Sequence, residues 1–194
     1  MYEKAFLTGC DEKTEWMLPW FFKNYRFYNK SPLVFADFGI SDQRLVEGYV
    51  DAIIDLQEDT DGKGWFKKPE AMMLCPSWKT VWIDTDCEIL ESVDNIFDLL
   101  VPNKLNMVED KPWTKRNGWN GPWYNSGVVG FIDKPQILRQ WTQWVKESHG
   151  GIEAGRVGHG DQEVLYERLD SLGKLTYINE LPNGLNAIVA IATY

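Results

Sequence analysis

The sequence predicts an α/β protein in which helices cover both faces of a mostly parallel sheet. Short apolar runs alternate with segments of helical periodicity, and these runs are continuous rather than interrupted by polar residues. Continuous runs are typical of strands buried on both faces, as in parallel sheets. A length of 194 residues suits one domain, so we expect residues 1–194 to form a single unit.

The expected elements follow one another without an internal repeat or a low-complexity linker. A strand at 4–9 precedes a helix over 14–28, in which Pro19 fits only in the first turn or at a kink. Further strands are expected at 33–37, 52–56, 81–84, 128–132 and 175–178, and further helices at 69–74, 137–146 and 162–169.

The composition narrows the classes of function. A formal net charge of −9 disfavours general binding to nucleic acid. The three cysteines lack metal-knuckle spacing and indicate free thiols in a reducing compartment, so we expect a cytoplasmic protein without a signal peptide. No apolar run approaches the ~20 residues of a membrane span. The sequence contains no zinc-protease, serine-hydrolase, P-loop or dinucleotide-binding motif.

Asp84 and Asp86 form the sharpest motif. A run of apolar strand residues leads into them, and in an extended segment residues two apart point to the same side. Both carboxylates would then hold one hard cation, Mg²⁺ or Mn²⁺, together with phosphate oxygens of a substrate. Asp11 and Asp37 also stand at strand ends. Together with Asp84, they would share the edge where parallel sheets bind ligands.

Three further segments each allow a functional and a structural interpretation. Asn125 and Ser126 precede Gly127, where they either bind a hydroxylated substrate or form an ordinary turn. Asp161 and Gln162 open a helix, where Asp161 either belongs to a site or caps the helix. A platform for an acceptor sugar and a packed core are both consistent with a cluster of rings at Trp113, Trp119, Trp123 and Tyr124.

In this order the segments resemble the GT-A glycosyltransferases, and most closely family eight, the glycogenin and galactosyltransferase-like group. The resemblance covers about residues 4–186 and depends on the ordered set rather than on any one motif. The set consists of the first strand with Thr8 and Asp11, Asp37-Phe38-Gly39-Ile40-Ser41, Trp65-Phe66-Lys67-Lys68-Pro69, the Asp84 and Asp86 motif, Asn125-Ser126-Gly127 and Asp161-Gln162.

The resemblance implies a GT-A fold and a metal-dependent glycosyltransferase. Its donor would be a nucleotide-sugar, most often a uridine diphosphate sugar, and transfer would retain the anomeric configuration. The acceptor would be a carbohydrate or another hydroxyl compound. By the same resemblance, Thr8 and Asp11 would face the nucleoside; Lys68 and a Mn²⁺ or Mg²⁺ ion on Asp84 and Asp86 would face the diphosphate; and the catalytic side would contain Asn125, Asp161 and Gln162.

One departure separates this sequence from the resembling family. The family carries a third metal ligand in a C-terminal H-x-x-G-x-x-K-type segment, whereas no histidine follows His159 here. Two alternatives therefore stay open: a nucleotide-sugar- or carbohydrate-binding protein with little or no turnover, and a nucleotidyltransferase on a related fold. The second is disfavoured, because Asp11 and Glu12 occupy the loop where that class holds triphosphate with glycine and basic residues.

Overall fold

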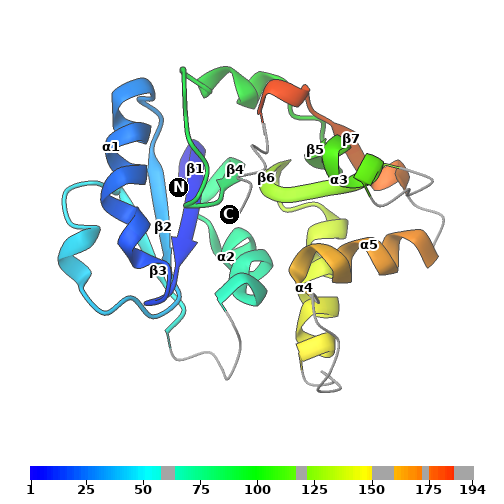
Figure 1. Cartoon of the computed structure of the whole chain (residues 1–194), viewed down its shortest axis with the longest axis horizontal. Helices are drawn as coiled ribbons and strands as arrows, with labels where there is room; N and C mark the ends of the chain where they lie inside the picture. The colour runs from blue at the N-terminus through cyan, green and yellow to red at the C-terminus, as the bar shows by residue number, and fades with distance from the viewer. Residues whose placement is uncertain (58–63, 117–121, 150–159, 172–174, 186–194) are drawn as a thin grey trace.

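The computed structural model describes residues 1–57, 64–116, 122–149, 160–171 and 175–185. At its centre is a seven-stranded sheet in the order β3-β2-β1-β4-β6-β5-β7 (Figure 1). Its strands are β1 (Tyr2–Cys10), β2 (Leu33–Asp37), β3 (Ala52–Asp55), β4 (Ser77–Ile83), β5 (Leu105–Glu109), β6 (Tyr124–Ile132) and β7 (Ile178–Glu180). All neighbouring strands are parallel except that β6 runs antiparallel to β4 and β5. The predicted mostly parallel sheet is confirmed.

Helices cover the sheet on both faces, and each face has its own hydrophobic core. One core includes buried residues of α1 (Leu18–Tyr28), and the other includes buried residues of α2 (Lys68–Leu74), α4 (Gln136–His149) and α5 (Asp161–Ser171). A 3₁₀ turn, Glu15–Met17, precedes α1, and Pro19 lies in the first turn of α1 as the sequence allowed. The short α3 (Lys111–Arg116) follows β5.

The second half of the chain departs from the sequence prediction in two places. Strand β5 and helix α3 were not predicted, because β5 is short and carries the polar Asn106 at its second position. The strand expected at 175–178 is wrong in its bounds: Leu175–Tyr177 form a 3₁₀ turn, and the strand is Ile178–Glu180. Pairing with β5 sets the bounds of β7, so the failure to predict β5 also explains the wrong bounds of this last strand.

The carboxyl ends of β1, β2 and β4 lie at one edge of the sheet. Cys10 is paired with Asp37, and Leu7 with Trp82, so the residues that follow these strands are neighbours. Gly9 allows the close approach of β1 to β2, because a Cβ atom there would lie 2.5 Å from the carbonyl oxygen of Ala36. Among the described residues, no helix has the length and hydropathy needed to cross a bilayer.

Candidate active site

A cavity of about 200 Å³ opens at the carboxyl ends of β1 and β4. Its wall combines three acidic side chains, two lysines and two large aromatic rings. The lining residues are Gly9, Cys10, Asp11, Lys13, Thr14, Met17, Phe38, Gly64, Lys68, Trp82, Asp84, Thr85 and Asp86. Four of the eight residues that the sequence singled out are therefore brought together here: Asp11, Lys68, Asp84 and Asp86.

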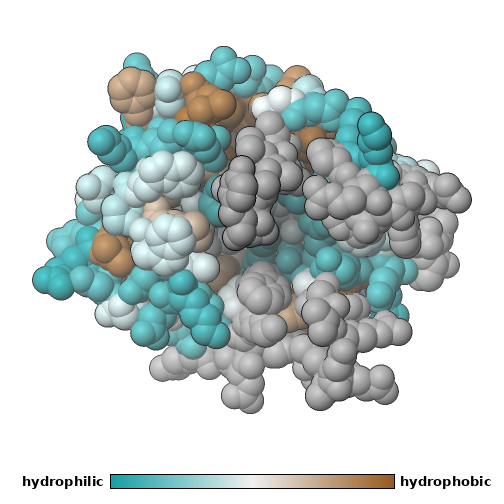
Figure 2. Space-filling model, viewed as in Figure 1, coloured by the Kyte–Doolittle hydropathy of each residue, from teal (hydrophilic) through white to brown (hydrophobic). Residues whose placement is uncertain are grey.

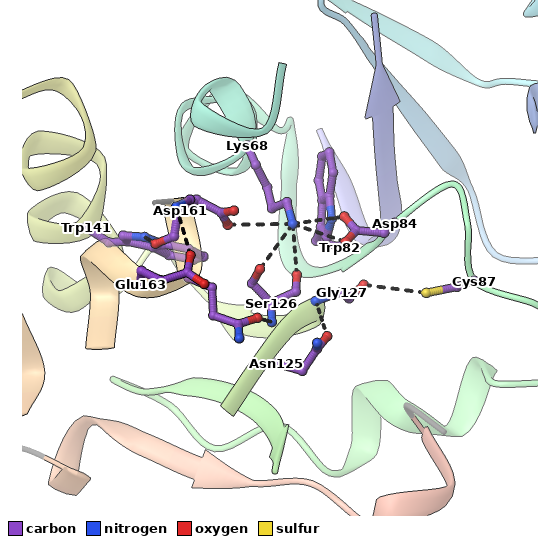
Figure 3. A network of polar contacts seen from close by, with 12 residues as sticks. Lys68, Trp82, Asp84, Cys87, Asn125, Ser126, Gly127, Trp141, Asp161 and Glu163 are labelled. Carbon is purple, nitrogen blue, oxygen red and sulfur yellow. Dashed lines mark hydrogen bonds and ion pairs between the residues drawn. The ribbon is translucent and has the colours of Figure 1, made fainter. Parts of the chain in front are cut away.

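Lys68 lies at the centre of a cluster of polar contacts (Figure 3). It is the first residue of α2, and its side chain is only 5% exposed. Its Nζ atom lies 2.9 Å from Oδ1 of Asp84 and 3.6 Å from Oδ2 of Asp161. The same nitrogen donates to the main-chain oxygen of Ser126 at 3.2 Å and to its hydroxyl at 3.3 Å. Lys68 thus links the end of β4, the start of β6 and the start of α5.

Charge balance within this cluster shifts the pKa values of its members. Burial alone would lower the pKa of Lys68, but the charges of Asp161 and then Asp84 outweigh it, so the pKa lies above its ordinary value. The pKa of the Asp161 carboxyl is raised, first by burial and also by Asp84, although Lys68 acts in the opposite direction. The site therefore holds a cation that stays protonated between two acids.

The acidic motif after β4 is a turn and not the extended segment that the sequence analysis assumed. The amide of Cys87 donates to the carbonyl of Asp84 at 3.1 Å, which closes a turn over Thr85 and Asp86. Both carboxylates nevertheless line the same cavity. They differ in their surroundings, because Asp84 accepts hydrogen bonds from Lys68 and the Trp82 indole, whereas Asp86 is exposed. The pKa of Asp86 is raised, by partial desolvation first and then by the charge of Asp84.

The two residues expected to face the nucleoside lie in different environments. Asp11 lines the cavity, and its Oδ1 accepts hydrogen bonds from the amide of Lys13 and the hydroxyl of Thr14. Thr8 is fully buried and is not among the lining residues. It lies between Phe6 and Cys10 on the face of β1 that packs on the α1 core, and of these three residues only Cys10 reaches the cavity. Asp37 also turns away from a ligand: its Oδ1 accepts from the amides of Gly39 and Ile40.

None of the residues expected on the catalytic side lines the cavity: Asp161 belongs to the Lys68 cluster, and Gln162 and Asn125 flank Ser126 of that cluster. Asp161 reaches Lys68, and its helix start is instead closed by Glu163, which accepts from the amide of Gly160 at 2.8 Å. The capping interpretation of Asp161 is therefore wrong. Gln162 accepts the amide of Ser126 at 2.8 Å, which ties α5 to β6.

Two of the expected site segments have a mainly structural placement. Oδ1 of Asn125 accepts the amide of Gly127 at 2.6 Å, so this part of its side chain closes a local turn. Trp123 and Tyr124 are buried, and the Trp123 ring packs on Tyr166 at 4.2 Å between centroids, which excludes these two from an exposed acceptor platform. Trp119 and His159, and the side chain of Trp113, lie outside the described parts of the chain.

Two aromatic rings that line the cavity, Phe38 and Trp82, were not predicted as site residues from the sequence. The rings of Phe38 and Trp82 are stacked with centroids 6.2 Å apart, and the ammonium of Lys68 lies 5.6 Å from the Trp82 ring centroid. Lys67, also buried, donates to the carbonyls of Leu56 at 2.7 Å and Phe38 at 3.5 Å, which fixes the loop that carries Phe38. Trp82 stands two residues before Asp84 on the same strand face, and this spacing was a signal available in the sequence.

Solved structures of glycosyltransferases share this architecture. The glycosyltransferase GlyE of Streptococcus pneumoniae TIGR4 superposes with a TM-score of 0.66 at 16% identity, over 96% of this chain and 47% of that one. Galactosyltransferase LgtC, solved with donor and acceptor sugar analogues, gives a TM-score of 0.61 at 13% identity, over 92% of this chain and 73% of that one. The bifunctional glycosyltransferase WbbM gives a TM-score of 0.57. The chain has the GT-A fold.

The likeness is one of fold and not of close sequence. This chain spans about half the length of the GlyE chain that it matches. No protein-family model and no curated protein sequence matches it. The GT-A fold expected from the resemblance is thus confirmed, while activity and ligands depend on the site itself.

Proposed function

We propose that this chain is a metal-dependent glycosyltransferase that binds a nucleoside diphosphate sugar, most often a uridine diphosphate sugar, in the cavity between β1 and β4. The observation that carries the proposal is that Asp84, Asp86 and Lys68 line one cavity at the carboxyl edge of the sheet, together with Asp11. A diphosphate needs cations, and a hard divalent ion on two carboxylates beside a lysine supplies them. The GT-A neighbours act on sugars, which agrees with this assignment.

The side chains present suit Mn²⁺ or Mg²⁺. Carboxylate oxygens are the ligands that these ions prefer, and Asp84 and Asp86 both line the cavity. Among the described residues, no histidine, cysteine or further acid joins these two carboxylates to form a three-ligand group. Diphosphate oxygens and water would therefore complete the ligand set. When bound there, the ion would supply positive charge to the leaving diphosphate.

Lys68 has a definite part in this chemistry. Its ammonium is held by Asp84, Asp161 and Ser126, and it donates a fixed positive charge next to the cavity. Because the position is buried, this charge interacts strongly with an incoming diphosphate. On the far side of Lys68, we place the donor sugar and the acceptor near Asp161, Gln162 and Asn125. LgtC, whose structure is also known with an active-site glutamine replaced by glutamate, offers a parallel for Gln162.

On the nucleoside side we place Asp11 in the cavity wall and Thr8 buried behind it. Asp11 lines the cavity together with Phe38 and with Thr14 and Met17, which precede α1. The proposal also includes transfer with retention of the anomeric configuration and a cytoplasmic location. The location is supported by three free thiols at Cys10, Cys75 and Cys87, which suit a reducing compartment.

Asp86→Asn provides the sharpest test of the metal. Asp86 is exposed and makes no direct hydrogen bond or ion pair with Lys68, so this variant removes a proposed metal ligand and leaves the direct contacts of the buried cluster in place. We expect wild-type protein to bind uridine diphosphate sugars by calorimetry only when Mn²⁺ is present, and the variant to bind at least about tenfold more weakly because an amide lacks the charge. Asp98→Asn, at another exposed acid, is the matched control and should leave affinity unchanged.

Turnover distinguishes the two candidate functions that remain. A glycosyltransferase releases the nucleoside diphosphate when donor, Mn²⁺ and an acceptor are present, and water entering the cavity would give slow release without acceptor. The alternative, a nucleotide-sugar-binding protein, rests on the presence of only two converging acids in the described parts of the chain. Donor binding without release of the diphosphate, across a panel of acceptors, would favour that alternative.

A further inference from the structure

The outer face of α1 carries large rings that the core does not use. The buried face of this helix consists of Leu18, Phe21, Phe22 and Tyr25. On the opposite side, Trp20 and Phe27 are seven residues apart and are 44% and 78% exposed. One turn before Trp20, Trp16 is 75% exposed. In Figure 2 the surface over this helix mixes pale, brown and teal side chains.

The charge on this face is also one-sided. Between residues 16 and 30 the sequence contains Lys23, Arg26 and Lys30 and no acid, although the whole chain has a net charge of −9. Lys23 and Lys30 are exposed, and Arg26 is paired with Asp51 at 2.8 Å. One acid from another segment reaches this end of the face, because the amide of Lys30 donates to Asp94 at 3.3 Å. Glu15, just before this stretch, is held by Ser41, whose amide and hydroxyl donate to it. The face therefore presents tryptophan, phenylalanine and free lysine together.

The loop after β4 bounds this face on one side. Asn24 donates to the carbonyl of Ile89 at 2.7 Å and fixes the loop against α1. Next to Ile89, Leu90 is 72% exposed, but Glu88 and Glu91 are exposed as well. An anionic partner would be repelled from this loop and attracted to the helix, which limits how it could approach.

We propose that the outer face of α1 and its two flanking segments, defined by Trp16, Trp20, Lys23, Phe27 and Lys30, binds the surface of an anionic phospholipid bilayer. Exposed single rings are common, but three rings and two lysines in one stretch of chain without an acid resemble the composition of segments that lie in a membrane interface. Tryptophan prefers the headgroup level, and lysines there interact with anionic lipids. A second copy of this chain is a poorer occupant, since the symmetric contact would oppose lysine to lysine.

This placement has a consequence for the cavity. Thr14 and Met17, on either side of Trp16, line it. A bilayer bound along α1 would therefore lie next to the part of the cavity where we place the nucleoside. The inference concerns an association surface and does not depend on catalysis, so its test is independent of the proposed function.

The test is binding of the full chain to vesicles of phosphatidylcholine with and without phosphatidylglycerol, measured by flotation. We expect binding to the anionic vesicles, weakened by salt. The variant Trp16→Gln, Trp20→Gln, Phe27→Gln should bind at least about tenfold more weakly, because apolar area entering the interface drives binding. Trp78→Gln is the matched control: Trp78 is 47% exposed on β4, away from α1, and its replacement should change nothing.

A second variant examines the charge. Lys23→Gln with Lys30→Gln should lower binding to anionic vesicles by about fivefold for each lysine near the surface, and should leave binding to neutral vesicles unchanged. Unaltered melting temperatures would show that both variants fold. Absence of wild-type binding to anionic vesicles, or equal binding by the triple variant, would overturn the proposal. So would a wild-type dimer in sedimentation that the triple variant abolishes.

Discussion

The two halves of the sheet differ in how their order is encoded. In β3, β2, β1 and β4 the strands are parallel, and each contains a short apolar run that can be recognised in the sequence. In the other half, β6 runs antiparallel to both of its neighbours, β4 and β5, and the pairing of β5 with β6 shifts register between Met107 and Val108. The first half is set by local pattern, and the second depends on contacts between distant segments.

The Lys68 cluster lies where the two halves meet. Asp84 follows β4 in the parallel half, whereas Ser126 lies on β6 and Asp161 follows it in the chain. A site assembled this way requires both halves to be folded, which connects the stability of the sheet to the geometry of the cavity.

Replacing this lysine should have the largest effect. Lys68→Met removes the cation and leaves Asp84 and Asp161 without their partner, one of them fully buried. Removal of one member of a buried ion pair costs about 3–5 kcal/mol. We expect a loss of this size in the free energy of unfolding, measured by urea titration, together with loss of nucleotide binding.

Lys146→Met is the control for that comparison. Lys146 pairs with Glu70 at 2.6 Å between α4 and α2, but it is 57% exposed, so the pair contributes less than about 1 kcal/mol. If both variants lost the same stability, the cluster at Lys68 would be no more than an ordinary ion pair.

The antiparallel half can be weakened separately through Asn106. This side chain is fully buried on β5, accepts from the amide of Val101 at 2.8 Å and from Asn179 at 3.0 Å, and donates to the carbonyl of Gly130 at 3.0 Å. Asn106→Ala leaves these groups unpaired, so we expect a loss of about 1–3 kcal/mol by urea titration.

Nucleotide affinity in the same variant then reports on the coupling of the halves. Asn106 does not line the cavity, so affinity below the melting transition should stay within about threefold of wild type. Asn179→Ala, which removes only one of these bonds, should cost less than about 1 kcal/mol. A large loss of affinity in Asn106→Ala would show that the antiparallel half shapes the cavity directly.

The same contrast explains what the sequence could predict. Asp84, Asp86 and Asp11 could be singled out because each follows a strand that local pattern predicts, whereas Lys68 was named only through the resemblance to the GT-A glycosyltransferases. The resemblance implied Thr8 on the nucleoside side, but its full burial depends on how α1 packs on β1, which local pattern does not give. Asn106 could not be predicted, since a polar residue in a short strand is stable only when its partners from Val101, Gly130 and Asn179 are in place.

The smallest predicted effect concerns the open end of the cavity, within the parallel half. A Cβ atom at Gly64 would lie 3.1 Å from Oδ2 of Asp11 and 3.4 Å from the ring of Phe38. Gly64→Ala therefore adds a methyl group beside the acid proposed to face the nucleoside, and we expect uridine diphosphate affinity to fall by about three- to tenfold in calorimetry. An alanine also restricts the unfolded chain, a gain of about 0.4–1 kcal/mol that would partly hide any strain. Gly184→Ala receives the same gain, and its Cβ meets nothing within 4 Å, so the difference between the two variants isolates the effect of the methyl group in the cavity. Equal uridine diphosphate affinity in both variants would show that the nucleoside does not bind beside Asp11.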